Sequence, residues 1–271
     1  MFNPKVFVAE FLGTFALVLV GAAAGLYQVG IMGVALAYGL AVIAFTYTLG
    51  HVSGMHINPA VTLGLALNGT IKWLEALVYW IAQLAGAVLA AFALKTFIGL
   101  LDPNAFAGMA SNGLLTTQFP YYAMGVEALL TFLLVNVVLH AAVDGKAGQF
   151  AGVAIGVTYM IAVFVGAPLT GASLNPARSF GPAVFTSAIT AGTPDFQNPL
   201  FYLVYFVGPF IGSVVAVILY RFFKYEFVTS EDIDDDEENE EDVVVVVEEP
   251  KEKPARKPAA RKSTVRKTTK K

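Results

Sequence analysis

The stretches SGMHINPAVTLG (Ser53–Gly64) and TGASLNPARSFG (Thr170–Gly181) decide the fold, because they carry the same Asn-Pro-Ala box 117 residues apart. A second pair of similar stretches, AEFLGTFALVLV (Ala9–Val20) and VEALLTFLLVNV (Val126–Val137), lies at the same offset of 117 residues. Two matches at one offset indicate an internal duplication rather than chance. The chain therefore contains two related halves, and each half has one Asn-Pro-Ala box.

The composition of both halves is that of a membrane protein. Of the 271 residues, 56% are hydrophobic and 14% are charged, against roughly 25% charged residues in ordinary soluble domains. The segment from Lys224 to the end holds 11 of the 17 Lys and Arg and 14 of the 20 Asp and Glu. The first 223 residues therefore carry only six basic and six acidic side chains, which suits a segment buried in hydrocarbon.

Six apolar stretches are long enough to cross a bilayer as helices, which takes roughly 20 residues each. The sequence predicts an all-α membrane protein with spans at 5–26, 33–51, 72–98, 121–143, 151–168 and 199–223. Two further apolar stretches, 58–69 and 175–186, are too short to span and begin with Asn-Pro, so we expect re-entrant half-helices there. Each half (about 5–98 and 121–223) holds three spans, and this odd number inserts the second copy upside down in the membrane.

The distribution of charge predicts the orientation. Six spans place both termini on one side, and most basic residues of the first 223 positions fall on that side. The positive-inside rule then places both termini in the cytoplasm, and we expect a multi-pass protein of the plasma (cytoplasmic) membrane. Residues 1–223 form the predicted transmembrane domain. Residues 224–271 are first acidic and then basic, which predicts a disordered cytoplasmic tail.

Two roles remain open for this tail. Its basic end is expected to associate with anionic lipid headgroups, and the alternative is a tether or plug on the cytoplasmic side. Nucleic acid is not expected as a partner, although the basic end is dense in Lys and Arg.

The two boxes predict the chemistry of the membrane centre. Asn is a favoured N-cap and Pro fits the first turn of a helix, so each box begins a half-helix. Half-helices that enter from opposite faces meet start to start, with both positive dipole ends at the centre, where cations and protons are then disfavoured. The loops before the boxes, Gly54–Ile57 and Gly171–Leu174, are expected to expose backbone carbonyls as a row of acceptors, while the Asn carboxamides donate to a neutral solute. The box residues are Asn58, Pro59, Ala60, Asn175, Pro176 and Ala177.

These motifs, with AQLAG between them and SLNPARSFGPAV at the second box, resemble the aquaporin (major intrinsic protein) family over residues 1 to about 224. The resemblance implies a bundle of six helices and two half-helices, assembled as a homotetramer with one pore per subunit. It also implies a selectivity filter of four residues, namely Tyr38, Val163, Ala172 and Arg178. Strict water channels of the family usually carry His at the position of Val163, so this filter is more similar to plant vacuolar and nodulin-type members.

The resemblance implies a passive channel that conducts water in single file and excludes ions and protons. Val163 and Ala172 make the filter apolar and wide, so we expect leak of other small neutral solutes. The main alternative is a facilitator chiefly for one such solute, namely ammonia, hydrogen peroxide, urea, glycerol or a metalloid hydroxide. Ser179 and Ala183 stand where dedicated glycerol facilitators typically carry Asp and a basic residue. A structural membrane protein is the alternative of another class, but it would need neither intact boxes nor Arg178.

Four ionisable residues in or near the spans need a role. Glu10 and Glu127 are repeat mates inside spans, and we expect their carboxylates to accept hydrogen bonds from backbone N–H groups of the re-entrant loops. His56 is expected to be packed and to hold the first loop, whereas His51 is a candidate pH sensor for a gate. The chain has no cysteine and no nucleophile–base or metal-ligand pattern, so we predict no enzymatic activity, no cofactor and no metal site.

Overall fold

The computed structural model describes residues 3–100, 119–186 and 199–224, and this part of the chain consists of helices and the loops that join them, without strands. Six helical segments of it are long and apolar enough to cross a membrane, as the sequence predicts. The predicted tail lies outside the described residues, apart from Lys224. The six spans are Pro4–Leu26, Gly30–Ser53, Trp73–Ile98, Pro120–Val143, Gly148–Thr170 and Pro199–Lys224.

The helices divide between the two halves that the sequence repeat defines. The first half contains α1 (Pro4–Leu26), α2 (Gly30–Ser53), the half-helix α3 (Pro59–Leu67) and α4 (Trp73–Gly99). The second half contains α6 (Pro120–Val137), α7 (Ala151–Thr170), the half-helix α8 (Pro176–Thr186), α9 (Pro199–Tyr202) and α10 (Gly208–Lys224). Three short segments complete its spans: the π-helix η2 (Val138–Val143) after α6, the 3-10 turn η3 (Gly148–Phe150) before α7 and the π-helix η4 (Leu203–Val207) between α9 and α10.

The ends of the helices differ by a few residues from the predicted spans. The second span begins at Gly30 rather than at 33, and the fifth continues through Pro168 to Thr170. Hydropathy reports the apolar stretch, whereas the helix itself ends where its backbone is capped. That cap is Gly171, whose φ of 83° places it in the left-handed region that glycine adopts without strain.

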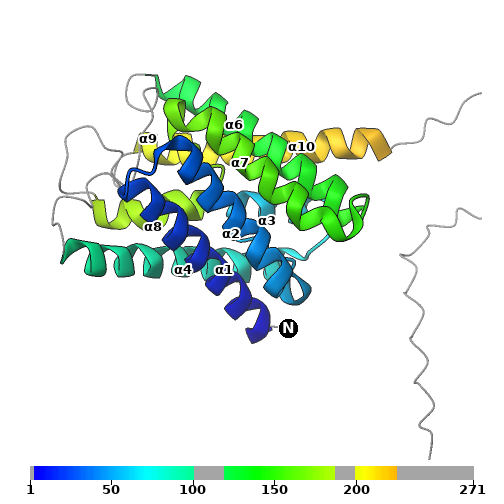
Figure 1. Cartoon of the computed structure of the whole chain (residues 1–271). Helices are drawn as coiled ribbons and strands as arrows, with labels where there is room; N and C mark the ends of the chain where they lie inside the picture. The colour runs from blue at the N-terminus through cyan, green and yellow to red at the C-terminus, as the bar shows by residue number, and fades with distance from the viewer. Residues whose placement is uncertain (1–2, 101–118, 187–198, 225–271) are drawn as a thin grey trace, which may run out of the picture. The chain divides into compact units, whose positions relative to one another are not determined.

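The packing of the helices repeats between the two halves. Within the halves, α1 packs on α4 and α2 as α6 packs on α10 and α7. Between the halves, α2 packs on α7, and each half-helix packs on the last long helix of the other half, α3 on α10 and α8 on α4. Figure 1 shows this arrangement, in which both halves surround the two half-helices. The halves therefore interlock rather than lie as separate bodies.

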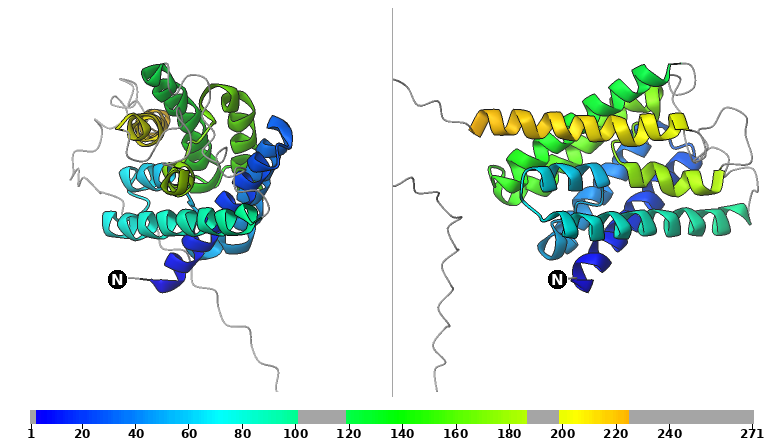
Figure 2. Two further views of the ribbon diagram at one scale, coloured as in Figure 1. Left: turned by 90° about the vertical axis from the view of Figure 1, so that its left-hand side faces the viewer. Right: turned by 180° about the vertical axis from the view of Figure 1, so that it is seen from behind.

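The half-helices lie end to end, with their first turns facing each other (Figure 2). α3 runs from this meeting point toward the side of the bundle on which α1 begins and α10 ends, and α8 runs toward the opposite side. We call the side with the start of α1 the terminal side. Two helix starts thus meet inside the bundle, as the inverted repeat predicts.

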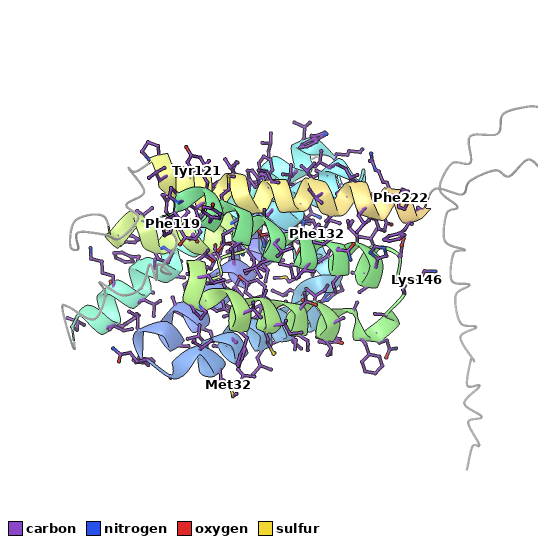
Figure 3. The ribbon with its side chains drawn as sticks, turned by 90° about the horizontal axis from the view of Figure 1, so that it is seen from above. Met32, Phe119, Tyr121, Phe132, Lys146 and Phe222 are labelled. Carbon is purple, nitrogen blue, oxygen red and sulfur yellow. The ribbon has the colours of Figure 1, made fainter. Side chains whose placement is uncertain are left out.

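The outer surface of the bundle carries large apolar side chains, as a bilayer requires. Leu74 is 78% exposed, and Met32 and Tyr121, which point outward in Figure 3, are 63% and 69% exposed. In water such a surface would aggregate. In hydrocarbon it faces lipid tails, so the chain is a multi-pass membrane protein.

Candidate functional site

The two Asn side chains cross-link the half-helices at their meeting point. Asn58 Nδ2 donates to Leu174 O at 2.8 Å, and Asn175 Nδ2 donates to Ile57 O at 2.7 Å. The oxygen of each carboxamide caps its own half-helix, since Asn58 Oδ1 accepts from Ala60 N at 2.8 Å and Asn175 Oδ1 accepts similarly at the start of α8. Each NH₂ group has two hydrogens, so one further donor per Asn is available to a solute.

The loops before the boxes have a strained backbone. In the first loop, Gly54, Met55 and Ile57 have φ values of 82°, 54° and 44°. The second loop repeats this pattern, with Ala172 at 47° and Leu174 at 55°. Residues other than glycine adopt this left-handed region at a cost of the order of 1 kcal/mol or more, and persist there only when their surroundings hold them.

The carboxylate of Glu10, on α1, accepts four hydrogen bonds in and around the first loop. One carboxylate oxygen accepts from Ser53 Oγ at 2.7 Å and from His56 N at 2.9 Å. The other oxygen accepts from Ile57 N at 2.7 Å and from Gln83 Nε2 at 2.8 Å. The carboxylate therefore binds two backbone N–H groups that the loop conformation leaves without helical partners.

Glu127 holds the second loop from α6 in the same manner. Its Oε1 accepts from Thr170 Oγ1 at 2.6 Å and from Ser173 N at 2.9 Å, and its Oε2 accepts from Leu174 N at 2.8 Å. Both glutamates are 0% exposed. The repeat therefore reproduces the loop and its support together.

Two tyrosines, to which the sequence alone assigns no role, complete this support. Tyr79 Oη donates to Ser53 O at 2.6 Å, and Tyr205 Oη donates to Thr170 O at 2.7 Å. Each hydroxyl thereby satisfies the last carbonyl of α2 or α7, just before the chain leaves the helix. A single Tyr in an apolar span gives no sign of such a bond, because aromatic side chains also face lipid.

His56 belongs to the first loop, and its side chain packs against residues of α3 and α4. Its Nδ1 lies 3.2 Å from Thr62 Oγ1, and its ring lies 4.5 Å from the ring of Tyr79. His51, by contrast, lies exposed in the last turn of α2. It does not line the cavity described below, so its role in a pH-dependent gate stays a prediction.

Two of the four predicted filter residues, Arg178 and Tyr38, contact each other, and Arg178 lies on α8, the half-helix that runs away from the terminal side. Arg178 stands in the first turn of α8, where its Nε donates to Tyr38 Oη at 3.0 Å and its Nη2 donates to Gly171 O at 3.2 Å. Val163 and Ala172 belong to the same apolar cluster as Tyr38. A guanidinium has five N–H groups, so two bonds leave donors for a solute.

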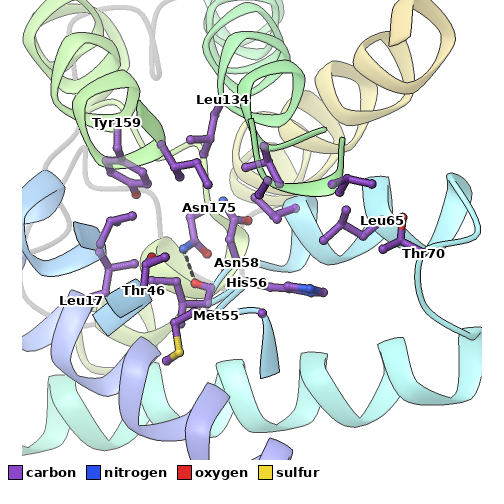
Figure 4. Close-up of a pocket in the computed structure, with 18 residues that line it drawn as sticks. Leu17, Thr46, Met55, His56, Asn58, Leu65, Thr70, Leu134, Tyr159 and Asn175 are labelled. Atoms are coloured by element: carbon purple, nitrogen blue, oxygen red, sulfur yellow. Dashed lines mark hydrogen bonds between the residues drawn. The ribbon is translucent and has the colours of Figure 1, made fainter. Parts of the chain in front are cut away.

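A cavity of about 340 Å³ extends from the boxes toward the terminal side. Asn58 and Asn175 lie near the middle of its lining in Figure 4, between Tyr159 and Thr70, and Thr70 and Val143 belong to the loops and helix ends of the terminal side. Most of its remaining lining is apolar. Such a lining offers passing water few competing partners besides the Asn pair.

The repeat relates this cavity to the filter. The predicted filter consists of Tyr38, Val163, Ala172 and Arg178. Each of these residues has an equivalent 117 positions away in the other half, and all four equivalents line the cavity. These equivalents are Ile155, Thr46, Met55 and Val61. Corresponding positions of an inverted repeat lie on opposite sides of the membrane centre and face the same axis. The repeat equivalents of the predicted filter residues therefore gather around the cavity on the terminal side.

The described ranges contain no group of three or more His, Cys, Asp or Glu side chains placed to hold a metal ion. The polar groups at the centre are carboxamides, one guanidinium, backbone carbonyls and hydroxyls. These groups can exchange hydrogen bonds with a neutral molecule.

Comparison with known proteins agrees with this geometry. The profile of the family described as major intrinsic protein matches residues 2–220. A glycerol uptake facilitator protein-like 6 of Lactiplantibacillus plantarum is 39% identical over 79% of this chain and 96% of that protein. Aquaporin Z of Rhodopseudomonas palustris is 38% identical over 81% of this chain and 93% of that protein. The X-ray structure of the aquaglyceroporin from Plasmodium falciparum aligns with a TM-score of 0.70 at 27% identity, covering 80% of this chain and 95% of that one.

Proposed function

Because the chain belongs to the major intrinsic protein family, whose members are passive channels and not enzymes, we propose that it conducts water as its main permeant. Protons and other ions are excluded, and other small neutral solutes leak at lower rates. The observation that carries this proposal is the pair of carboxamides, Asn58 and Asn175, at the meeting point of two helix starts.

The exclusion of cations follows from the charges at this point. Each helix start carries a partial positive charge of roughly half an elementary charge, and Arg178 adds a full positive charge on one side of it. A water molecule that accepts from the free N–H groups of Asn58 and Asn175 directs its own hydrogens away from the centre. It therefore cannot pass a proton along a row of waters.

A facilitator chiefly for another small neutral solute is the second candidate. Val163 and Ala172 offer no side-chain polarity, so the filter does not select water by donors on those walls. The similarity to a protein named glycerol uptake facilitator protein-like 6 favours this candidate, and Ser179 and Ala183 argue against glycerol itself.

We extend the proposal to the orientation and assembly. Lys5, Lys72, Lys146, Arg221 and Lys224 lie at helix ends or loops of the terminal side, so the positive-inside rule makes that side cytoplasmic. The expected location is the plasma (cytoplasmic) membrane, the expected assembly is a homotetramer with one pore per subunit, and the tail associates with anionic lipid.

Stopped-flow light scattering of proteoliposomes tests the function. We expect water permeability well above that of empty liposomes, with lower permeability to glycerol, urea and ammonia. A pH-sensitive dye in the lumen should report no added proton flux. If the protein passes a larger solute but no water, the second candidate replaces the first.

A further inference from the structure

Tyr159 lies next to the predicted filter but is not part of it. It stands on α7, one turn before Val163, and only 2% of its side chain is exposed. Its ring stacks on the ring of Tyr38, with centroids 5.9 Å apart and planes inclined by 29°. Tyr38 in turn accepts a hydrogen bond from Arg178. Tyr159 therefore places a second aromatic ring next to the predicted filter.

The hydroxyl of Tyr159 acts on the loop before the second box. It donates to Ser173 O at 3.0 Å, which is one of the carbonyls expected to accept hydrogen bonds from a solute. Because this bond occupies the Ser173 carbonyl, the lone pairs of the Tyr159 phenol oxygen can accept a hydrogen bond from a solute instead. A solute at this level therefore meets a bulky aromatic side chain where the backbone alone would leave space.

Tyr159 also borders the cavity. It lines the cavity together with Asn58 and Asn175, and Figure 4 shows it pointing from α7 into that space. None of the four filter residues lines the cavity. Val42, which stands 117 positions earlier, lines it as well. Tyr159 therefore occupies a pore-facing position of the repeat, at the boundary between the cavity and the filter.

The close approach of α2 and α7 holds the two tyrosine rings in place. A Cβ atom on Gly39 would lie 2.6 Å from Gly156 O, and a Cβ atom on Gly156 would lie 2.7 Å from Gly39 O. Both distances are shorter than real Cβ contacts, so this approach requires glycine on both helices. Because Gly39 follows Tyr38 directly and Gly156 lies one turn before Tyr159, the rings meet and have little room to turn away.

We propose that Tyr159 is a further specificity-determining residue of the pore, which sets the upper size limit for solutes between the filter and the boxes. This inference rests on the proposed function as a pore for water and small neutral solutes. Val163 leaves room at the level of the filter, and the phenol of Tyr159, longer by a ring and a hydroxyl, fills the passage one turn further in. The excluded class is polyols of the size of glycerol or larger, and the admitted class is water and solutes of similar width.

The test is the permeability of proteoliposomes with the full-length protein to water, urea and glycerol. Tyr159→Leu removes the ring, Tyr159→Phe removes only the hydroxyl, and Tyr159→Trp enlarges the side chain. Phe164→Leu is the matched control, because Phe164 lies on the same helix but is 51% exposed on its outer face. Elution as a single species in detergent, at the volume of the parent protein, shows that a variant is folded.

We expect Tyr159→Leu to raise the ratio of glycerol to water permeability by about tenfold, equal to about 1.4 kcal/mol in the barrier. Tyr159→Phe should keep the ratio of the parent, because the ring remains, and Tyr159→Trp should lower water permeability. The proposal is overturned if folded Tyr159→Leu behaves like Phe164→Leu, or if the parent already passes glycerol as fast as Tyr159→Leu. If Tyr159→Leu does not fold, unchanged water permeability in Tyr159→Trp overturns it. If the parent protein shows no water permeability, the proposed function is refuted instead. The ratio of urea permeability to glycerol permeability then still tests the role of Tyr159.

Discussion

The carboxylate of Glu127 joins α6 to the second re-entrant loop, and the substitution Glu127→Gln tests how strongly the loop depends on it. Gln has nearly the same shape, but one of its two oxygens becomes an NH₂ group. The lower-cost orientation keeps the oxygen at Thr170 and Ser173, which supply two of the three hydrogen bonds, and turns the NH₂ group toward Leu174 N. Two donors then face each other in a buried site.

The expected loss follows from this count. A hydrogen bond to a charged group contributes about 1.5–3 kcal/mol, and a buried donor left without a partner costs about 1–3 kcal/mol. We therefore expect Glu127→Gln to destabilise the protein by about 3 kcal/mol, which lowers Tm by roughly 6–12 °C for a chain of this size. Glu10→Gln should cost more, because the oxygen that becomes NH₂ faces two donors, Ile57 N and the Gln83 amide.

Thermal unfolding in detergent, followed by circular dichroism, measures both losses. Glu75→Gln is the control, since the exposed Glu75 carboxylate accepts one bond from Lys72 N at 3.1 Å, and a surface change of this kind costs at most about 0.5 kcal/mol. A loss of Tm in Glu127→Gln no larger than in Glu75→Gln would refute the reasoning. So would a smaller loss in Glu10→Gln than in Glu127→Gln.

Three further predictions concern the filter and the terminal side. Val163→His adds a polar ring and narrows the filter, so the ratio of water to urea permeability should rise in stopped-flow assays; an unchanged ratio contradicts the assignment. Arg178→Val removes the positive charge of the filter, so urea permeability and proton leak into dye-loaded proteoliposomes should both rise, and a tight pore in this variant would argue against the role of Arg178. At the terminal side, burial alone would raise the pKa of Asp144, but hydrogen bonds from Lys224 (2.5 Å) and Tyr220 (2.6 Å) hold it below its ordinary value of 3.8. A lowered folded-state pKa stabilises the protein above the ordinary pKa, and this stabilisation disappears as the pH falls through the folded value. Tyr220→Phe should therefore begin to lose stability at a higher pH than the parent in an acid titration of the folded fraction, and superimposable titrations would exclude the effect.

Much of the architecture could be predicted because membrane burial leaves a strong pattern in the sequence. Long apolar stretches report spans, and the Asn-Pro pairs report half-helix starts. Glu10 and Glu127 could be assigned as loop supports because a charge inside a span needs a partner. The Asn-Pro pairs and the glutamates differ from the apolar residues around them, so one or two positions are enough to identify each signal.

The roles of Tyr79, Tyr205 and Tyr159 could not be predicted in this way. A helix in a membrane bundle is apolar on all sides, so hydrophobic periodicity does not separate its lipid face from its inner face. A tyrosine can lie at the lipid interface, in the core or in the pore, because it has an apolar ring and a polar hydroxyl. Its role depends on which backbone carbonyl its hydroxyl reaches, and that is decided by the packing of helices distant in sequence.

The repeat explains why selectivity is expected on one side of the boxes only. An inverted duplication builds the same backbone passage twice, so each pore-facing position of the filter has an equivalent in the cavity. The side chains break this symmetry: Val42, Thr46 and Val61 line the cavity and correspond to Tyr159, Val163 and Arg178, of which only Tyr159 also lines it. Two narrow constrictions in series would impose two desolvation barriers on every solute, while one constriction followed by a wide apolar cavity imposes only one. Because Tyr159 and Arg178 are the bulky or charged members of these pairs, we expect the barrier that selects solutes to lie on their side of the boxes, with the cavity as the vestibule on the terminal side.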